Sequence, residues 1–174
     1  MTNDLLYFTR LLLKRQLELA GQIFPEDWVG CKIRGILLRR YFQSCGRNLQ
    51  IGLGAKIEHA DKVSVGSDVY IGHGCWISGH GGGIMLENQV MLGPYVTMVS
   101  NNHRSHSGSA RFAKGAPAPI VIGRGCWVAS GALITAGVNL GPGCVVGGGA
   151  VVTKSFPANS KLLGVPARVA GSTE

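Results

Sequence analysis

The sequence lacks any long apolar run and any layout typical of a secretory signal. No stretch approaches the roughly 20 consecutive apolar residues that a membrane-spanning helix needs. Near the N-terminus, Arg10, Lys14 and Arg15 stand after and among the apolar residues, and no small-residue cleavage site follows them. We therefore expect a cytoplasmic protein.

Acidic residues are few, and cysteine pairs with metal-site spacing are absent. Nine Asp and Glu stand against 17 Lys and Arg, which gives a formal net charge of +8. The number of cysteines is odd, which argues against a framework of disulfide bonds. We predict buried structural thiols and no bound metal. The five cysteines are Cys31, Cys45, Cys75, Cys126 and Cys144.

What the sequence does have is a six-residue period. From Ile122 to Thr153 an aliphatic residue returns at every sixth position, and the residue four places after it is small or β-branched. This period is neither helical nor a simple strand alternation. It is typical of a parallel β-helix, in which short strands form three faces and stacked coils bury each other's apolar side chains. The aliphatic positions are Ile122, Val128, Ile134, Leu140, Val146 and Val152.

Earlier hexads follow the same pattern with interruptions. The phase slips by two residues before Val65 and slips again at the glycine run 81–83. The regular pattern then stops after Met98, but the interval from Met98 to Ile122 is a whole number of hexads and so preserves the phase. We therefore predict that segment 100–119 is a loop that leaves and rejoins an intact β-helix.

The N-terminal part differs in composition from the rest. Two amphipathic segments, at about 2–23 and 28–44, predict a helical cap over residues 1–48, ahead of a β-helix domain over residues 49–174. Residues 1–48 hold eight Lys and Arg against four Asp and Glu, half of the net charge. One interpretation is a pair of helices that covers the open end of the β-helix. The other is a basic surface for the anionic cytoplasmic leaflet or an anionic substrate.

Loop 100–119 is the part of the β-helix domain most suited to chemistry. It is polar and basic, and it contains His103 and His106, two of the five histidines. Functional residues concentrate on loops held by a rigid scaffold. Imidazole is also the side chain whose ordinary pKa suits proton transfer near neutral pH. Both histidines are therefore candidates for a general base.

Three blocks in order carry a resemblance to a known family: GPYVTMVSNNH, the run from PIVIGRGCW to GGGAVVTK, and GVPARV. Over these blocks the chain resembles the hexapeptide-repeat acyltransferases, specifically the sugar O-acetyltransferase branch. That branch includes galactoside and maltose acetyltransferases and enzymes that acetylate exopolysaccharide, capsule or lipopolysaccharide sugars. The resemblance runs from about Arg34 to the end. It implies an all-β fold, a left-handed parallel β-helix with an N-terminal α-helical cap and a protruding loop at 100–119.

The resemblance also implies an activity, the transfer of an acetyl group from acetyl-CoA to a hydroxyl in a ternary complex without an acyl-enzyme. The catalytic histidine of the family falls on His103, as general base, with His106 as the competing candidate. Asn102 in the same motif is expected to contact substrate. His73 stands where the galactoside enzyme has a sugar-contacting Asn, so the acceptor is not expected to be a simple galactoside.

Binding of acetyl-CoA is assigned by the same resemblance. A second arginine of the family is replaced here by Gly171, which implies fewer phosphate contacts from this chain or contacts from another subunit. Two of the assigned side chains are cationic and suit the nucleotide phosphates. The residues assigned to acetyl-CoA are Ser130, Gly148, Thr153, Lys154 and Arg168.

The expected partners also follow from the resemblance. The family assembles as homotrimers with active sites at subunit interfaces, and the acceptor would be a sugar or a surface-polysaccharide precursor. No nucleic-acid partner is expected, and the basic N-terminal helices suggest peripheral membrane proximity. Three alternatives remain: N-acetylation of an amino sugar or antibiotic, a non-catalytic scaffold, and a zinc protein like the γ-type carbonic anhydrases. The last would use His73, His103 and His106 as ligands.

Overall fold

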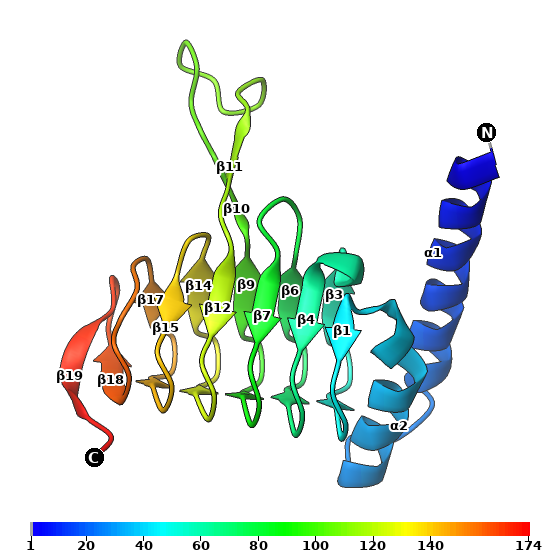
Figure 1. The fold of residues 1–174 in the computed structure, drawn as a ribbon, viewed down its shortest axis with the longest axis horizontal. Helices are drawn as coiled ribbons and strands as arrows, with labels where there is room; N and C mark the ends of the chain where they lie inside the picture. The colour runs from blue at the N-terminus through cyan, green and yellow to red at the C-terminus, as the bar shows by residue number, and fades with distance from the viewer. Residues whose placement is uncertain (1) are drawn as a thin grey trace.

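The centre of the molecule is a three-sided prism of parallel strands. Two helices lie at one end of the prism and an arm projects from one of its edges (Figure 1). The structure, a computed structural model, describes residues 2–174. The predicted arrangement, a parallel β-helix with N-terminal helices and a projecting loop, is confirmed.

Each face of the prism is one parallel sheet. The first face contains β1 (Ser44–Cys45), β4 (Val63–Val65), β7 (Ile84–Leu86), β12 (Ile120–Ile122) and β15 (Asn139–Leu140). The second contains β2 (Gln50–Ile51), β5 (Tyr70–Ile71), β8 (Met91–Leu92), β13 (Trp127–Val128), β16 (Val145–Val146) and β18 (Ser160–Leu163), with β19 (Arg168–Ser172) added antiparallel. The third contains β3 (Lys56–Glu58), β6 (Trp76–Ser78), β9 (Thr97–Val99), β14 (Leu133–Thr135) and β17 (Val151–Val152).

The aliphatic positions of the hexads form one continuous core. Ile122, Val128 and Ile134 come from the three faces of a single coil, and all three are fully buried. The small positions Cys126 and Ala132 are equally buried at the corners between these faces. The six-residue period therefore places every aliphatic side chain inside the prism, as predicted.

The strand register shows where the extra residues between coils are placed. In the regular part Val121 pairs with Asn139, which lies three hexads further along the chain. Earlier pairs are separated by more than three hexads: Ser44 with Ser64, Ser64 with Met85, and Met85 with Val121. The predicted slips are therefore confirmed. Within each coil the three faces stay one hexad apart, so all the extra residues lie at the corner between the third face and the first.

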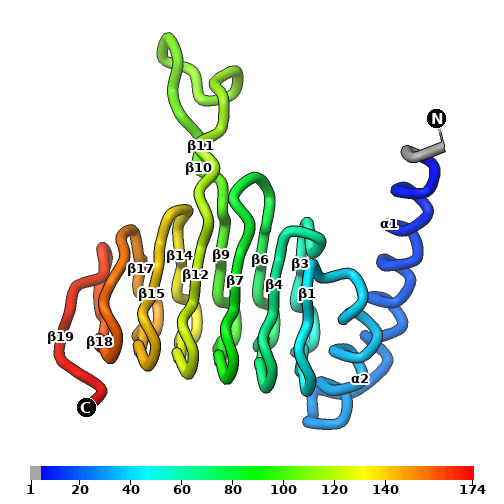
Figure 2. Tube along the Cα trace, viewed as in Figure 1, coloured from blue at the N-terminus to red at the C-terminus, as the bar shows by residue number. Residues whose placement is uncertain are grey.

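We call this corner the insertion edge. It carries the short helix η2 (Ala60–Lys62), the glycine turn 79–83 and the arm, residues 100–119. The arm is the longest insertion and rises alone above its neighbours (Figure 2). At its base, β10 (Asn101–His103) pairs antiparallel with β11 (Gly115–Pro117).

The cap consists of α1 (Thr2–Gly21), α2 (Trp28–Leu38) and the short helix η1 (Arg39–Tyr41). It covers the N-terminal end of the prism, at the opposite end from β19 (Figure 1). The prism itself begins at β1, a few residues before the boundary expected at residue 48. No helix within residues 2–174 has the length and apolar character needed to cross a membrane.

Arg34 joins the cap to the prism. Its side chain is only 3% exposed, although its place in a run of basic residues suggested a solvated surface charge. Nε donates to the carbonyl of Ile51 at 2.7 Å, and Nη1 donates to the carbonyl of Phe24 at 2.9 Å. Nη2 pairs with the carboxylate of Glu26 at 3.0 Å. One guanidinium therefore ties α2, the loop before it and the first coil together.

Candidate active site

His103 is exposed at the outer end of β10, opposite Gly115 on β11. Because side chains alternate along a strand, Asn101 shares the face of β10 that carries His103, whereas Asn102 faces the other side. The side-chain oxygen of Asn101 is buried and has no hydrogen-bond donor among the residues that the structure describes. The sequence motifs did not single out Asn101, although strand alternation from His103 points to it.

His106 lies beyond the paired strands of the arm. Its backbone N–H donates to the carbonyl of Ser109 at 2.9 Å, and the N–H of Ser109 donates back at 3.0 Å. Ser107 and Gly108 between them have positive φ angles of 50° and 77°, which close a tight turn. His106 is therefore held by a local turn, while His103 is held by strand pairing nearer the prism.

Ser130 and Gly148 are stacked at the corner between the second and third faces, which we call the Ser130 edge. The N–H of Gly149 donates to the carbonyl of Ser130 at 2.9 Å, so these turns lie one coil apart. His73 lies on the same edge, two coils below Ser130, and its ring meets Tyr95 edge-on at 5.3 Å. At the usual strand spacing, two coils correspond to roughly 10 Å.

Thr153 and Lys154 lie on a different corner. They follow β17 at the insertion edge, two coils beyond the arm, and both are exposed. The Lys154 ammonium stands 5.5 Å from the centre of the Phe156 ring. Arg168 begins β19 beside the last turn of the Ser130 edge, and its Nη1 donates to the carbonyl of Ala167 at 3.0 Å. Neither cation pairs with a carboxylate that the structure describes.

One chain therefore divides the predicted residues between two edges. His103, Thr153 and Lys154 belong to the insertion edge, whereas Ser130 and Gly148 belong to the Ser130 edge. The third face of the prism separates the two sets. With the exception of His73, which is half-buried, every predicted site residue is exposed in the single chain.

The buried thiols have no chemical environment that would activate them. Burial raises the pKa of Cys75 to about 11 and that of Cys126 to about 12. A thiol with so high a pKa holds its proton and is a poor nucleophile or ligand near neutral pH. Within residues 2–174 no three His, Cys, Asp or Glu side chains gather closely enough to bind a metal. His73, in particular, is on a different edge from His103 and His106.

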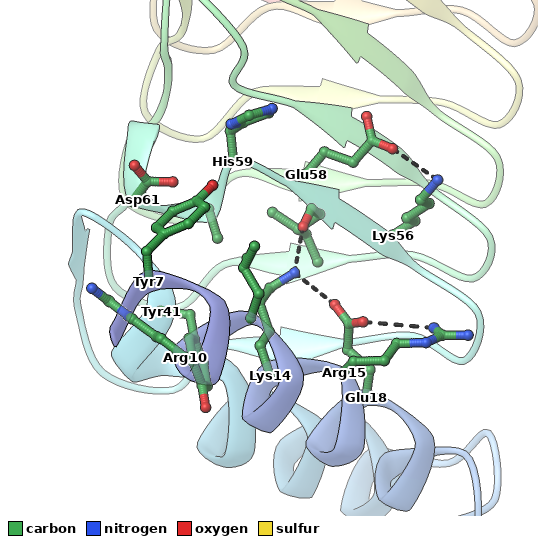
Figure 3. A pocket seen from close by; sticks show the side chains of 13 residues that line it. Tyr7, Arg10, Lys14, Arg15, Glu18, Tyr41, Lys56, Glu58, His59 and Asp61 are labelled. Atoms are coloured by element: carbon green, nitrogen blue, oxygen red, sulfur yellow. Dashed lines mark hydrogen bonds and ion pairs between the residues drawn. The ribbon is translucent and has the colours of Figure 1, made fainter. Parts of the chain in front are cut away.

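A groove of about 710 Å³ lies between α1 and the first coil (Figure 3). Its walls include Tyr7, Arg10 and Lys14 from the helix, and His59 and Asp61 from the insertion edge. None of the residues predicted for acetyl-CoA or catalysis lines it. The groove nevertheless lies on the same edge as the arm, two coils below it.

Comparisons with known proteins agree with this architecture. Residues 119–154 match the family model "Bacterial transferase hexapeptide (six repeats)". The chain is 32% identical to Nodulation protein L of Rhizobium leguminosarum bv. viciae over 178 residues, which covers 90% of this chain and 93% of that protein.

Two solved structures share the fold over nearly the whole chain. A maltose O-acetyltransferase from Clostridium difficile 630 has a TM-score of 0.81 and 25% identity, covering 99% of this chain and 90% of that one. A galactoside acetyltransferase in complex with coenzyme A has a TM-score of 0.81 and 24% identity, covering 94% and 80%. The second likeness is evidence for the fold alone. Together with the hexad core, these findings show that the chain is an acyltransferase and belongs to the hexapeptide-repeat O-acetyltransferase family.

Proposed function

We propose that this protein transfers the acetyl group of acetyl-CoA to a hydroxyl of a sugar or of a bacterial surface-polysaccharide precursor. His103 is the general base, and the site is completed by a second copy of the chain in a homotrimer of left-handed β-helices. The cytoplasmic location remains a prediction from the sequence. The predicted membrane proximity concerns the cap and not this site.

The observation that carries this proposal is the division of the predicted residues between two edges. An extended molecule such as acetyl-CoA needs contacts along its whole length to bind. If the insertion edge of one prism faces the Ser130 edge of its neighbour, His103, Lys154 and Ser130 border one cleft. A cyclic arrangement of copies repeats this contact at every interface. Neither edge alone offers both a base and the small residues expected along the pantetheine arm.

The chemistry assigned to His103 is proton transfer. Its neutral imidazole takes the proton of the acceptor hydroxyl as the oxygen attacks the thioester carbonyl. The C–S bond then breaks, the acetyl group remains on the acceptor oxygen, and the imidazolium returns the proton to the coenzyme A thiolate. General-base help of this kind is typically worth about 10² to 10⁴ in rate. An exposed, strand-held histidine suits the role because both acceptor and product can reach it.

A backbone N–H of the Ser130 turn is our candidate for stabilising the tetrahedral oxyanion. The N–H of Ser130 donates to no backbone carbonyl within the described part of the chain, whereas those of Ala129 and Gly131 do. A Cβ at Gly93 would lie 2.8 Å from this nitrogen, so the turn below must be glycine for the coils to stack. A preorganised backbone donor of this kind stabilises developing negative charge.

The groove under α1 is our candidate for holding the far end of a long acceptor. The groove shares the insertion edge with His103 and lies roughly 10 Å from the arm along the prism axis. An acceptor longer than one sugar unit, bound at His103, reaches Tyr7 and Asp61 if it runs along this edge toward the cap. This location supports an oligosaccharide or a sugar with a large substituent, rather than a simple galactoside.

The first test is acetyl-CoA turnover, followed by release of the free thiol. A panel of sugars, nucleotide sugars, amino sugars and oligosaccharides separates hydroxyl from amine acceptors. We expect His103→Ala to lower kcat by at least about a hundredfold, and His106→Ala to change it by less than about tenfold. An equal loss in both variants would refute the assignment of the base.

The shared site has its own test. We would mix His103→Ala chains with Ser130→Trp chains, refold them together, and compare the mixture with each variant alone. Because each interface takes one edge from each copy, roughly a quarter of the sites should be intact in a random mixture. Recovery of activity supports the shared site. A mixture as inactive as its parents, with mixed oligomers demonstrated by mass spectrometry, would contradict it.

A further inference from the structure

The cap carries most of the exposed apolar side chains of the molecule. Of the 21 large apolar side chains that the described residues leave exposed, 12 lie between residues 5 and 36. The remaining nine are spread over the prism, the arm and the C-terminal strand. Exposed apolar side chains gathered in one part of a molecule are typical of an interaction site.

Helix α1 has two different faces. The groove side contains Tyr7, Lys14 and Glu18, and these residues contact or face the prism. Leu5, Phe8, Leu12 and Leu19 follow the 3, 4 and 7 spacing of a separate stripe, and none of them lines the groove. Leu5 is 67% exposed and Leu12 is 49% exposed. This outer stripe contacts nothing in the described chain that would bury it.

Helix α2 also exposes apolar side chains, and it carries cations beside them. Trp28 and Ile36 are both about two-thirds exposed, at 67% and 66%. Lys32 lies one turn from each, with its ammonium 4.9 Å from the centre of the Trp28 ring. Arg39 follows directly and is exposed. The exposed Arg40 instead lies on the groove side, with its guanidinium 5.4 Å from the centre of the ring of the groove residue Tyr41. Among the side chains that the structure describes, Lys32, Arg39 and Arg40 form no ion pair.

The acids between residues 18 and 27 are engaged within the cap. Glu18 pairs with Lys14 at 2.7 Å, and Glu26 pairs with the buried Arg34 at 3.0 Å. Asp27 accepts a hydrogen bond from the N–H of Gly30 at 2.6 Å and caps α2. We call the exposed surface of α1 and α2 away from the groove the outer face of the cap. Among its described side chains it presents apolar groups and two cations, Lys32 and Arg39, that pair with no carboxylate.

We propose that the outer face of the cap docks on the surface of an anionic lipid bilayer. A helix with an apolar stripe and flanking cations lies in the plane of such an interface, with its apolar side chains among the upper acyl chains. Each cation near an anionic leaflet adds to the attraction. A second copy of the chain fits this face less well, because a symmetric contact would bring Lys32 and Arg39 against the same charges. Binding of the cap would leave the arm and both edges in water.

Vesicle flotation tests this directly, using the full chain and no substrate. The vesicles contain phosphatidylcholine with phosphatidylglycerol, or phosphatidylcholine alone. We expect binding to the anionic vesicles that weakens as salt is added. The pair Phe8→Ser and Leu12→Ser should lower the partition coefficient at least about tenfold, because two buried apolar side chains are lost. The pair Lys32→Gln and Arg39→Gln should lower it by roughly 30-fold.

Phe112→Ser is the matched control, because Phe112 is 84% exposed at the end of the arm and lies outside the cap. Circular dichroism of each variant separates lost binding from lost folding. Failure of the wild type to float with anionic vesicles would overturn the proposal. So would flotation that neither pair of substitutions weakens. A third outcome would also contradict the proposal. If the wild type does not bind vesicles and the Phe8 and Leu12 substitutions change its mass in analytical ultracentrifugation, the stripe joins copies of the chain. None of these outcomes depends on acetyl transfer.

Discussion

Removing the Arg34 side chain should detach the cap from the prism without unfolding the prism. The guanidinium donates to carbonyls of the first coil and of the loop before α2, and it neutralises Glu26. Arg34→Ala leaves these carbonyls without this donor and leaves the Glu26 carboxylate with the N–H of Leu53 but without its cation. The prism keeps its own core, to which Arg34 contributes no apolar side chain.

The expected loss of stability in Arg34→Ala follows from the burial of the groups that Arg34 contacts. Removing one partner of a buried ion pair costs about 3–5 kcal/mol, because the other charge stays without compensation. Glu26 is 35% exposed on its side chain, so water partly solvates it after the loss. The carbonyl of Ile51 is buried beneath α2 and has no such compensation. We therefore expect Arg34→Ala to lower the free energy of unfolding of the cap by about 3 kcal/mol, at the lower end of that range.

Hydrogen exchange measured by mass spectrometry is the assay. In Arg34→Ala, peptides from α1 and α2 should exchange about a hundredfold faster, which corresponds to about 3 kcal/mol at roughly 1.4 kcal/mol per tenfold change. Peptides around Ile122 and Ile134 should keep their protection. Arg39→Ala is the control, because it removes an exposed arginine just beyond the end of the same helix. Equal protection of the cap in both variants would refute the reasoning, because the buried Arg34 would then stabilise the cap no more than the exposed Arg39 does.

Three further predictions concern the prism and the arm. Ile134→Ala should destabilise the protein by about 3–4 kcal/mol in denaturant unfolding, because it empties a fully buried position; a loss below about 1 kcal/mol would mean that the coil collapses around the gap. Burial raises the pKa of Cys126 to about 12, whereas the unfolded thiol titrates near 9, so the native state retains a proton that the unfolded state loses. Cys126 should therefore lower the stability by about 1.4 kcal/mol per pH unit between about pH 9 and 12, in addition to the contribution of Cys75, and Cys126→Ala should reduce the slope by that amount. A Cβ at Gly82 would overlap the carbonyl of Ala118 at the base of the arm, so Gly82→Ala should reduce kcat while changing the melting temperature little. Gly125→Ala, where a Cβ meets nothing within 4 Å, should leave kcat unchanged, although the φ of 70° at this position means that it lowers the melting temperature.

The prism could be predicted because its physical requirements are local and repeated. Each coil needs an aliphatic residue at every sixth position, and Ile122, Val128 and Ile134 are buried as that pattern requires. The phase of the hexads also located the arm, because an insertion that preserves the period must leave and rejoin at one corner. The same arithmetic shows that Gly148 stacks directly above Ser130, since three hexads separate them and three hexads make one coil.

The helices of the cap could be predicted from the sequence, but their contacts with the prism could not, because the cap does not repeat. Arg34, Arg39 and Arg40 look alike in the sequence, yet only Arg34 is buried. What distinguishes it is the position of carbonyls from Phe24 and Ile51, which depends on how α2 meets the first coil. Helical periodicity fixes a side chain on a face of its helix but does not say which face meets the prism.

The candidate site shows a second kind of limit. The hexad phase assigns His103 to the insertion edge and Ser130 to the Ser130 edge, so the division between edges is already encoded in the sequence. The phase says nothing about which edges of two prisms face each other, because that depends on outward side chains that the period does not constrain. Met91 and Trp127 are such outward residues, paired side by side on the second face and both nearly half exposed. The site proposed above therefore appears in the sequence as two half-sites, one on each edge of the same prism.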